Sequence, residues 1–462
     1  MNATDNNTTL FAEHALLPHG WARDVRLAWD HDGTLAEVRP GAEAIPGEAH
    51  AAGPVVAGMP NLHSHAFQRA FAGLTEYRSH NAADSFWTWR DTMYRFALAV
   101  SPDQLEAIAT QLYIEMLRAG YTSVCEFHYL HHDSSGAPYA DPAEMALRLI
   151  AAAETAGIGL TLLPVLYQHA GFGGLPPRAD QRRFINSVDA FLAIVQRCIA
   201  RGVRTGIAPH SLRAVGQTAL RAALDGLNTL DASAPVHLHI AEQQAEVDDC
   251  LAWSGARPVQ WLLDHAPVDS RWCLVHATHM TADESRGAAG CGAVAGLCPS
   301  TEANLGDGVF DAPAFLDAGG RFGIGSDSHV SVSAVDELRL LEYSQRLVRR
   351  QRNVLASPKQ ADVAQRLWLA AAAGGAQASG QPAGALAVGR RADFVVLETD
   401  AAGAGLTAPQ QLAHAVFAVQ GTPAVRDVWV AGRQRIAGGA HPAAARAQVS
   451  FAVARSQLLA AA

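Results

Sequence analysis

The chain has 462 residues, of which 49% are hydrophobic and 17% charged, enough to bury a large core and to form one large domain with a smaller part. Its formal net charge is −9 and its basic residues are scattered, so no basic patch is present for nucleic acid or an anionic membrane. We therefore expect chemistry on small molecules, with neither a nucleic-acid nor a membrane partner.

The six cysteines show no Cys-x-x-Cys spacing and mostly lie within apolar segments, as free thiols do in reducing compartments. The N-terminus has no basic stretch followed by an apolar one, and no run of eighteen apolar residues occurs. These features predict a cytoplasmic protein.

Both ends of the chain read as β-structure. Residues 25–29 and 34–38 alternate around the turn Asp30-His31-Asp32-Gly33, which predicts a hairpin. Near the other end, residues 392–397 and 425–430 show similar short strands. We expect the two terminal segments to pair into one small β-domain.

The middle of the chain alternates between helix and strand. A capping box with proline begins at Ser101, apolar residues follow at helical spacing as far as Gly120, and a strand over 122–127 comes next. The same cadence leads from a helix after Asp141 into a strand over 160–166, and from a helix over 184–200 into a strand over 203–208. Such β-α-β alternation predicts a parallel sheet.

A parallel sheet of this length is either an open doubly wound sheet or a closed barrel. An open sheet gathers its ligand groups at one switch point, whereas a barrel uses the carboxyl ends of many strands. Here polar residues follow at least six strands, namely His63 with His65, His128 with Tyr129, His210, His239, His276 and Asp327. We therefore predict an α/β fold, a (β/α)8 TIM-like barrel over residues 58–378 with a small β-sandwich domain built from residues 1–57 and 379–462.

The barrel's strand ends carry a candidate metal site. Side chains two apart on a strand share a face, so His63 and His65 can bind one ion together. His239 competes with its same-face neighbour His237, and we favour His239 because Glu242, three residues on, lies where the strand should end.

Asp327 ends an apolar run, and by itself it is best explained as a helix N-cap. Beside three histidines it becomes a fourth ligand, which leaves a position for a water that Zn²⁺ can acidify. Glu242 suits proton transfer, and His276 suits stabilisation of the developing charge. The single lysine, Lys359, lies in a turn-like stretch, so no lysine is available to bridge two metals. We expect one zinc ion per chain, although Fe²⁺ or Mn²⁺ also accepts such ligands.

This set of residues resembles the amidohydrolase superfamily, in its branch of mononuclear zinc aminohydrolases, over nearly the whole chain. Within it, residues 63–70 (His-Ser-His-Ala-Phe-Gln-Arg-Ala), 73–76 and 86–90 resemble the formimidoylglutamate deiminases. The resemblance implies hydrolysis of N-formimino-L-glutamate to N-formyl-L-glutamate and ammonia in histidine degradation. It also implies that the binding partner is a small-molecule dicarboxylate. A homodimer is a further expectation, because barrels of this branch often dimerise.

Two substrate carboxylates need cationic or strong hydrogen-bonding partners. Arg213, just past a strand, can grip one in two-point fashion. By resemblance the glutamate moiety would be held by Gln68, Arg90, Tyr129, His210 and Arg213. Arg95 competes with Arg90 for its role.

Two other functions fit the pattern. One is an aminohydrolase of the same branch acting on a heteroaromatic ring, such as a guanine- or triazine-type deaminase, against which Arg90 and Arg213 argue. The other is a non-catalytic metal-binding scaffold. It would be favoured by loss of a proton carrier, but Glu242, His276 and Asp327 are all present.

Overall fold

The computed structural model describes residues 8–76, 86–419 and 424–461. Its centre is a parallel sheet in which the hydrogen-bonded order is β10-β8-β7-β6-β14-β13-β12-β11, with β9 paired to β8. The strands are β6 (Met59–Ser64), β7 (Tyr121–His128), β8 (Gly159–Leu166), β9 (Arg204–Thr205), β10 (Ala208–Pro209), β11 (Val236–Ile240), β12 (Trp272–His276), β13 (Val294–Leu297) and β14 (Arg321–Ile324).

The sheet closes on itself. Single parallel bridges join Ile207 to Val236 and Ser211 to His239, so the short strands β9 and β10 connect to β11. Together, β9 and β10 take the place of one strand in an eight-stranded barrel. The predicted (β/α)8 barrel is therefore confirmed, and its strands are buried on both faces as parallel strands require.

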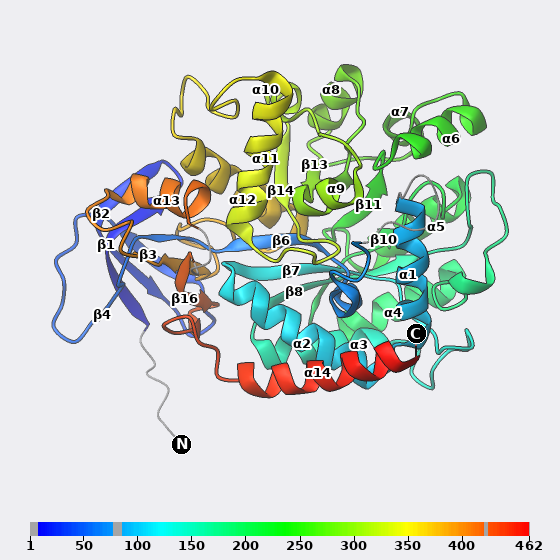
Figure 1. Ribbon diagram of the computed structural model, residues 1–462, viewed down its shortest axis with the longest axis horizontal. Coiled ribbons are helices and arrows are strands. Elements are labelled where there is room, and N and C mark those ends of the chain that lie inside the picture. The colour runs from blue at the N-terminus through cyan, green and yellow to red at the C-terminus, as the bar shows by residue number, and fades with distance from the viewer. Residues whose placement is uncertain (1–7, 77–85, 420–423, 462) are drawn as a thin grey trace.

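Helices cover the outside of the barrel (Figure 1). The capping box predicted at Ser101 is present, because the Ser101 side chain accepts a hydrogen bond from the backbone of Gln104. The helices of this layer are η1 (Ala66–Phe71), α1 (Phe86–Ala99), α2 (Pro102–Arg118), α3 (Glu144–Ala156), η2 (Ala179–Gln181), α4 (Val188–Ala200), α5 (Gln217–Leu230), α6 (Gln244–Ser254), α7 (Pro258–His265), α8 (Ala282–Gly290), α9 (Pro299–Leu305), α10 (Ala312–Asp317), α11 (Ala334–Arg349) and α12 (Val363–Ser379).

Helix α12 approaches the barrel strands unusually closely. A Cβ atom at Gly374 would lie 1.9 Å from the carbonyl oxygen of Phe322, and one at Gly375 would lie 3.0 Å from Pro60. The two glycines thus let the helix backbone rest against β14 and β6, the strands that lead into Asp327 and His63. The alanine- and glycine-rich composition of this helix is explained by that contact.

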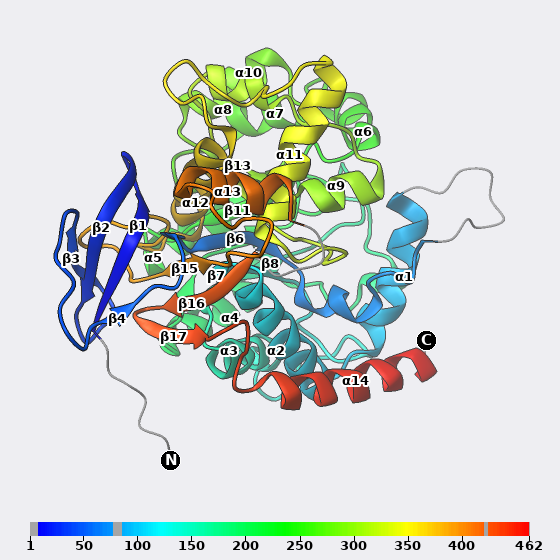
Figure 2. The ribbon, with the colours of Figure 1, turned by 60° about the vertical axis from the view of Figure 1, so that its left-hand side comes forward.

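The two ends of the chain share a second sheet of eight strands, ordered β17-β16-β15-β5-β1-β2-β3 with β4 on β1 (Figure 2). Antiparallel pairing of β5 with β15 joins the N-terminal strands to the C-terminal ones, as predicted. The strands are β1 (Thr9–Leu17), β2 (Gly20–Trp29), β3 (Leu35–Arg39), β4 (Ala49–His50), β5 (Val55–Ala57), β15 (Phe394–Leu397), β16 (Val425–Val430) and β17 (Arg433–Ile436).

Two further helices follow, α13 (Ala408–Phe417) and α14 (Ala444–Ala461). The last helix lies along α2 of the barrel rather than on the terminal sheet (Figure 1). The domain limits at residues 57 and 378 stay a prediction, and the contact between α14 and α2 ties the C-terminal segment to both parts.

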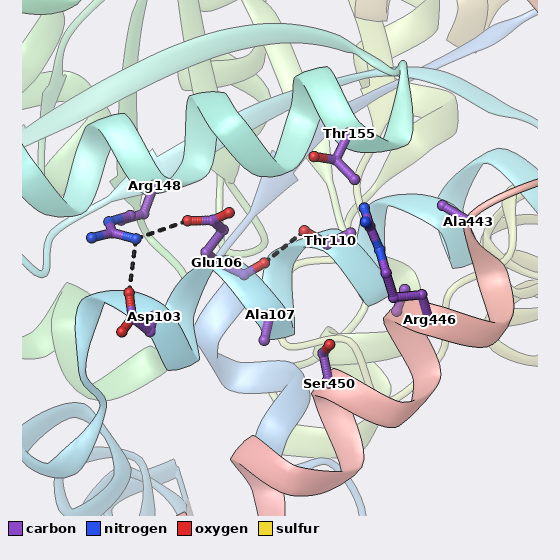
Figure 3. Close-up of a pocket in the computed structure, with 10 residues that line it drawn as sticks. Asp103, Glu106, Ala107, Thr110, Arg148, Thr155, Ala443, Arg446 and Ser450 are labelled. Atoms are coloured by element: carbon purple, nitrogen blue, oxygen red, sulfur yellow. Dashed lines mark hydrogen bonds and ion pairs between the residues drawn. The ribbon is translucent and has the colours of Figure 1, made fainter.

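A polar hollow of about 390 Å³ lies between α2, α3 and α14 (Figure 3). On one side Arg148 forms ion pairs with Asp103 and Glu106, and the exposed Arg446 projects from α14 on the other. This hollow is on the outer helix layer, away from the strand ends. Elsewhere, no helix in the described ranges is long and apolar enough to cross a lipid bilayer.

Candidate metal centre and active site

Four predicted ligands meet at the carboxyl ends of three barrel strands. His63 lies near the end of β6 and His65 directly follows it, His239 lies near the end of β11, and Asp327 follows β14. The Nε2 atoms of His63 and His239 are 2.9 Å apart, and the Nε2 atoms of His63 and His65 each lie 3.4 Å from Oδ1 of Asp327. All four side chains are at least nine-tenths buried. The structure therefore brings together the residues that the sequence predicted as ligands.

Backbone carbonyls fix which ring nitrogens face the centre. The Nδ1 atom of His65 is 2.9 Å from the carbonyl oxygen of Phe127, and that of His239 is 3.1 Å from the carbonyl oxygen of His210. Because a carbonyl only accepts hydrogen bonds, each Nδ1 carries the proton. In the neutral rings the lone pair is then on Nε2, which points at the other ligands.

A divalent ion fits this set of donors. Burial is the largest influence on the histidines and disfavours their charged form, lowering the pKa of His63 to about 3. Neutral imidazoles beside an ionised carboxylate are the ligands that zinc and similar ions select. The ligand atoms of His63, His65 and Asp327 lie within 4.8 Å of one another. The same residues would hold the ion, with a position left for water.

The backbone near the ligands has unusual φ angles and one close approach between strands. Asp327, with a φ of 44°, and His276, with a φ of 65°, adopt the left-handed region, which is costly for residues other than glycine. A Cβ at Gly325 would lie 2.8 Å from the Cβ of His63, so glycine is required there for β14 to approach β6. Asp327 does not cap a helix; Ser333 is the N-cap of α11.

The choice between His237 and His239 is resolved by depth in the barrel. Both side chains are buried, but Nε2 of His237 lies 2.8 Å from the carbonyl oxygen of Ala378 in α12. His237 therefore contacts helix α12 and not the ligand cluster. His237 is thus a core histidine with a satisfied hydrogen bond, and His239 is the candidate ligand.

The two predicted proton carriers lie beside the ligands. Nε2 of His276 is 3.8 Å from Oε1 of Glu242 and 3.8 Å from Oδ2 of Asp327. Burial outweighs the neighbouring cations and raises the pKa of Glu242 to about 7, a value suited to accepting and returning a proton near neutrality. For His276, burial opposes the charged form, but Glu242 and the hydrogen bond with Glu302 outweigh it and raise its pKa to about 10.

A network of polar residues supports the ligands from β6 and β7, and sequence reasoning missed it. Glu126 accepts hydrogen bonds from the Ser64 hydroxyl at 2.5 Å and from the Ala66 backbone at 2.7 Å. Nε2 of His329 is 3.2 Å from the same serine hydroxyl, so the segment between His63 and His65 is held from both sides. A glutamate within an apolar strand was the available signal. His279 is likewise structural, with Nε2 2.8 Å from the carbonyl oxygen of Asp307.

The predicted substrate-binding residues form the next layer around the ligands. Gln68 donates a hydrogen bond to the Tyr129 hydroxyl at 3.0 Å, and the Tyr129 ring packs against His65 with ring centroids 5.0 Å apart. The His210 ring contacts that of His239 at 4.9 Å. The side-chain acceptor of Gln68, its Oε1, is buried without a partner in the described part of the chain. These three residues therefore adjoin the ligand cluster, and Gln68 keeps one polar atom available.

The two predicted arginines belong to one cationic wall. The Arg213 Nε is buried and has no hydrogen-bond partner within residues 8–76, 86–419 and 424–461. Arg90 lies over the Tyr94 ring at 5.6 Å and interacts electrostatically with Arg213. Arg95 is exposed, which favours Arg90 in the substrate role. Gln181, not predicted, donates to the hydroxyls of Tyr94 at 3.2 Å and Tyr167 at 2.9 Å.

Comparison with known proteins agrees with this geometry. The Amidohydrolase family matches residues 55–435, and the family described as "Formimidoylglutamate deiminase HutF, N-terminal domain" matches residues 7–52. A formimidoylglutamate deiminase of Pseudomonas aeruginosa is 55% identical over 460 residues, which cover 98% of this chain and 100% of that one.

Solved structures show the same fold. An amidohydrolase from Brucella melitensis superposes with a TM-score of 0.92 at 50% identity, covering 98% of this chain and 99% of that one. An adenosine deaminase from Xanthomonas campestris, solved with bound zinc, superposes with a TM-score of 0.79 at 22% identity over 98% of each chain, which is a likeness of fold alone.

The barrel and its His-rich strand ends thus define a hydrolase of the amidohydrolase family, acting on carbon–nitrogen bonds. Within that family, identity over nearly the whole length and the matching N-terminal region show that the chain belongs to the formimidoylglutamate deiminases.

Proposed function

We propose that this site hydrolyses N-formimino-L-glutamate to N-formyl-L-glutamate and ammonia, as a step of histidine degradation. The observation that carries the proposal is the Nε atom of Arg213, which is buried beside Arg90 and has no hydrogen-bond partner among the described residues. A buried cation with an open donor is a site for an anionic group. A substrate with two carboxylates meets that requirement, whereas a guanine or triazine ring offers no charge to pair.

One zinc ion per chain is part of the proposal, held by His63, His65, His239 and Asp327. Three imidazole nitrogens and one carboxylate support this, as does the bound zinc of the Xanthomonas campestris structure. When bound, the ion supplies Lewis-acid activation of the attacking water. The described residues offer no lysine beside these ligands to bridge a second ion, since the only lysine, Lys359, lies in a turn outside the barrel.

Proton movements are assigned to Glu242 and His276. Glu242, with its pKa raised to about 7 by burial, takes a proton from the water and delivers it to the departing nitrogen. His276 is held by Glu302 through its Nδ1 at 3.3 Å, so its Nε2 is aimed at the centre. A charged imidazole there stabilises the oxygen on which negative charge develops.

The glutamate part of the substrate is assigned to the surrounding wall. Arg213 and Arg90 pair with the carboxylates, and the Gln68–Tyr129 pair with His210 supplies neutral hydrogen bonds. The proposed binding partner is thus a small-molecule dicarboxylate. We also place the protein in the cytoplasm, which five buried free thiols support.

The test is an assay of ammonia release from N-formimino-L-glutamate and from guanine, with metal measured in the same preparation. We expect turnover of the first and little of the second. We also expect poor turnover of a formamidine-bearing amine without the glutamate frame, although its reacting carbon is identical. Equal rates on the truncated amine or on guanine would overturn the substrate assignment and leave a broader aminohydrolase.

A further inference from the structure

We propose that Asp307 is a further substrate-binding residue, which accepts a hydrogen bond from the positively charged amidine head of the substrate. The proposal rests on the proposed function and adds a residue to it. Asp307 follows α9, on the loop after β13, and sequence patterns gave no reason to select it.

Asp307 is held by the residues next to both proton carriers. Its Oδ1 accepts a hydrogen bond from the side chain of Gln243, which directly follows Glu242. Its backbone carbonyl accepts one from Nε2 of His279, three residues after His276, at 2.8 Å. The loop that carries Asp307 is thereby fixed to the ends of β11 and β12, the strands from which Glu242 and His276 extend.

The remaining oxygen of this carboxylate, Oδ2, is the atom that points to a ligand. Asp307 is only 5% exposed, and its Oδ2 is buried without a hydrogen-bond partner in the described part of the chain. A buried acceptor without a hydrogen-bond partner destabilises the folded protein, and more so if it is charged. The buried hydroxyl of Thr278 is also without a partner in those residues. A ligand with N–H donors would satisfy such atoms.

The surroundings of Asp307 favour a cationic ligand. Burial, followed by the negative charge of Glu242, raises the pKa of Asp307 to about 9, and Glu302 and Asp327 act in the same direction. Several acids thus share this side of the site with one imidazole, His276. A positive charge placed among them would let Asp307 ionise and would offset the repulsion.

The substrate's reacting group has the matching chemistry. Its amidine is protonated near neutrality and presents planar N–H donors, which pair well with a carboxylate. The product carries a neutral formyl group in that place and makes no such pair. Asp307 would therefore favour binding of the substrate over the product, while Arg213 and Arg90 hold the carboxylates of both.

Binding of two ligands separates this role from a structural one. We would measure, on zinc-loaded enzyme by calorimetry, the affinity of N-guanidino-L-glutamate, whose head is a stable planar cation, and of N-formyl-L-glutamate. In Asp307→Asn we expect the guanidino ligand to weaken at least about tenfold, as loss of a charged hydrogen-bond partner does. The formyl ligand should change less than about threefold, within the spread of measured effects. The exposed Asp317, replaced by asparagine, is the matched control.

Each other outcome overturns the inference. Equal weakening of both ligands would show that Asp307 only supports the fold, and unchanged affinity for the guanidino ligand would show that it does not bind the head. If Asp307→Asn fails to fold, Gln243→Met removes the donor that orients Oδ1 and should show the same selectivity, while equal effects on both ligands there would again reject it. Failure of wild-type enzyme to release ammonia from N-formimino-L-glutamate would instead reject the proposed function.

Discussion

The Nε2 atoms of His63 and His239 lie 2.9 Å apart, although β14, β13 and β12 separate their strands in the sheet. In a closed barrel of eight strands this places the two residues on opposite walls, so they meet across the mouth. Two neutral rings that present Nε2 lone pairs to each other repel unless a proton or a cation lies between them. A bound ion would supply that cation, because it accepts the Nε2 lone pairs of both rings.

The first prediction separates His239 from His237. His239→Asn should lose its metal on dialysis against a chelator that leaves wild-type enzyme loaded, because one of four ligands is removed. His237→Asn should keep one metal per chain and lose about 1 kcal/mol of stability, because it breaks only the hydrogen bond to Ala378. Metal analysis and thermal unfolding of both variants check this. Two metals per chain in active wild-type protein would contradict the single site.

The second prediction concerns proton transfer. Glu242→Gln should keep its metal yet lower kcat about 10²- to 10⁴-fold, since a positioned proton carrier contributes about that much. The amide has nearly the same shape but cannot accept a proton from water. His276→Asn should behave similarly because stabilisation of developing charge is lost. A metal-replete Glu242→Gln enzyme with near-normal kcat would move the role to another residue.

The barrel and the residues that cluster as candidate ligands could be predicted from the sequence because each motif is local. His63 and His65 are two residues apart, and the strand period alone places them on one face. The choice of His239 over His237 rested on Glu242 nearby, and only the contact with Ala378 shows where His237 points. The period of two shows that both histidines share a face of the strand, but it does not show which of them contacts a helix and which reaches the ligand cluster.

The residues that sequence reasoning missed act through distant partners. Glu126 joins the site because β7 lies beside β6, and Asp307 because the loop after β13 is fixed to Gln243 and His279. Such contacts join segments about 60 residues apart, as for Glu126 with Ser64 and for Asp307 with Gln243. A glutamate within an apolar strand marks Glu126 as unusual, but no local pattern names the distant partners of Glu126 or Asp307, which are known only once the chain is folded.

The third prediction tests carboxylate recognition. Arg213→Met should lower kcat/KM on N-formimino-L-glutamate, with a loss of transition-state stabilisation of about 2–4 kcal/mol, because one partner of a desolvated charge pair is removed. The loss should shrink for an analogue that lacks the paired carboxylate. Arg446→Met, in the outer hollow of Figure 3, is the control and should leave the kinetics unchanged. An equal loss for both substrates would place Arg213 outside direct contact.

The fourth prediction uses a buried acid on α11. Glu337 is 0% exposed and accepts hydrogen bonds from Ser300, yet burial raises its pKa from the ordinary 4.5 to about 8. The folded protein therefore binds this proton more tightly than the unfolded chain does. Below pH 4.5 both states are protonated and the contribution to stability is complete; it falls as pH rises from 4.5 towards 8 and is then constant.

Glu337→Gln removes this titration, because an amide stays neutral throughout that range. The Tm of the variant minus that of the wild type should therefore become more positive between pH 5 and pH 8.5, whatever its value at pH 5. Thermal unfolding of zinc-loaded protein at a series of pH values measures the difference, with both proteins at the same metal concentration so that binding adds equally. A difference independent of pH would show that Glu337 is ionised in the folded protein at neutral pH, with its charge balanced by the hydrogen bonds from Ser300.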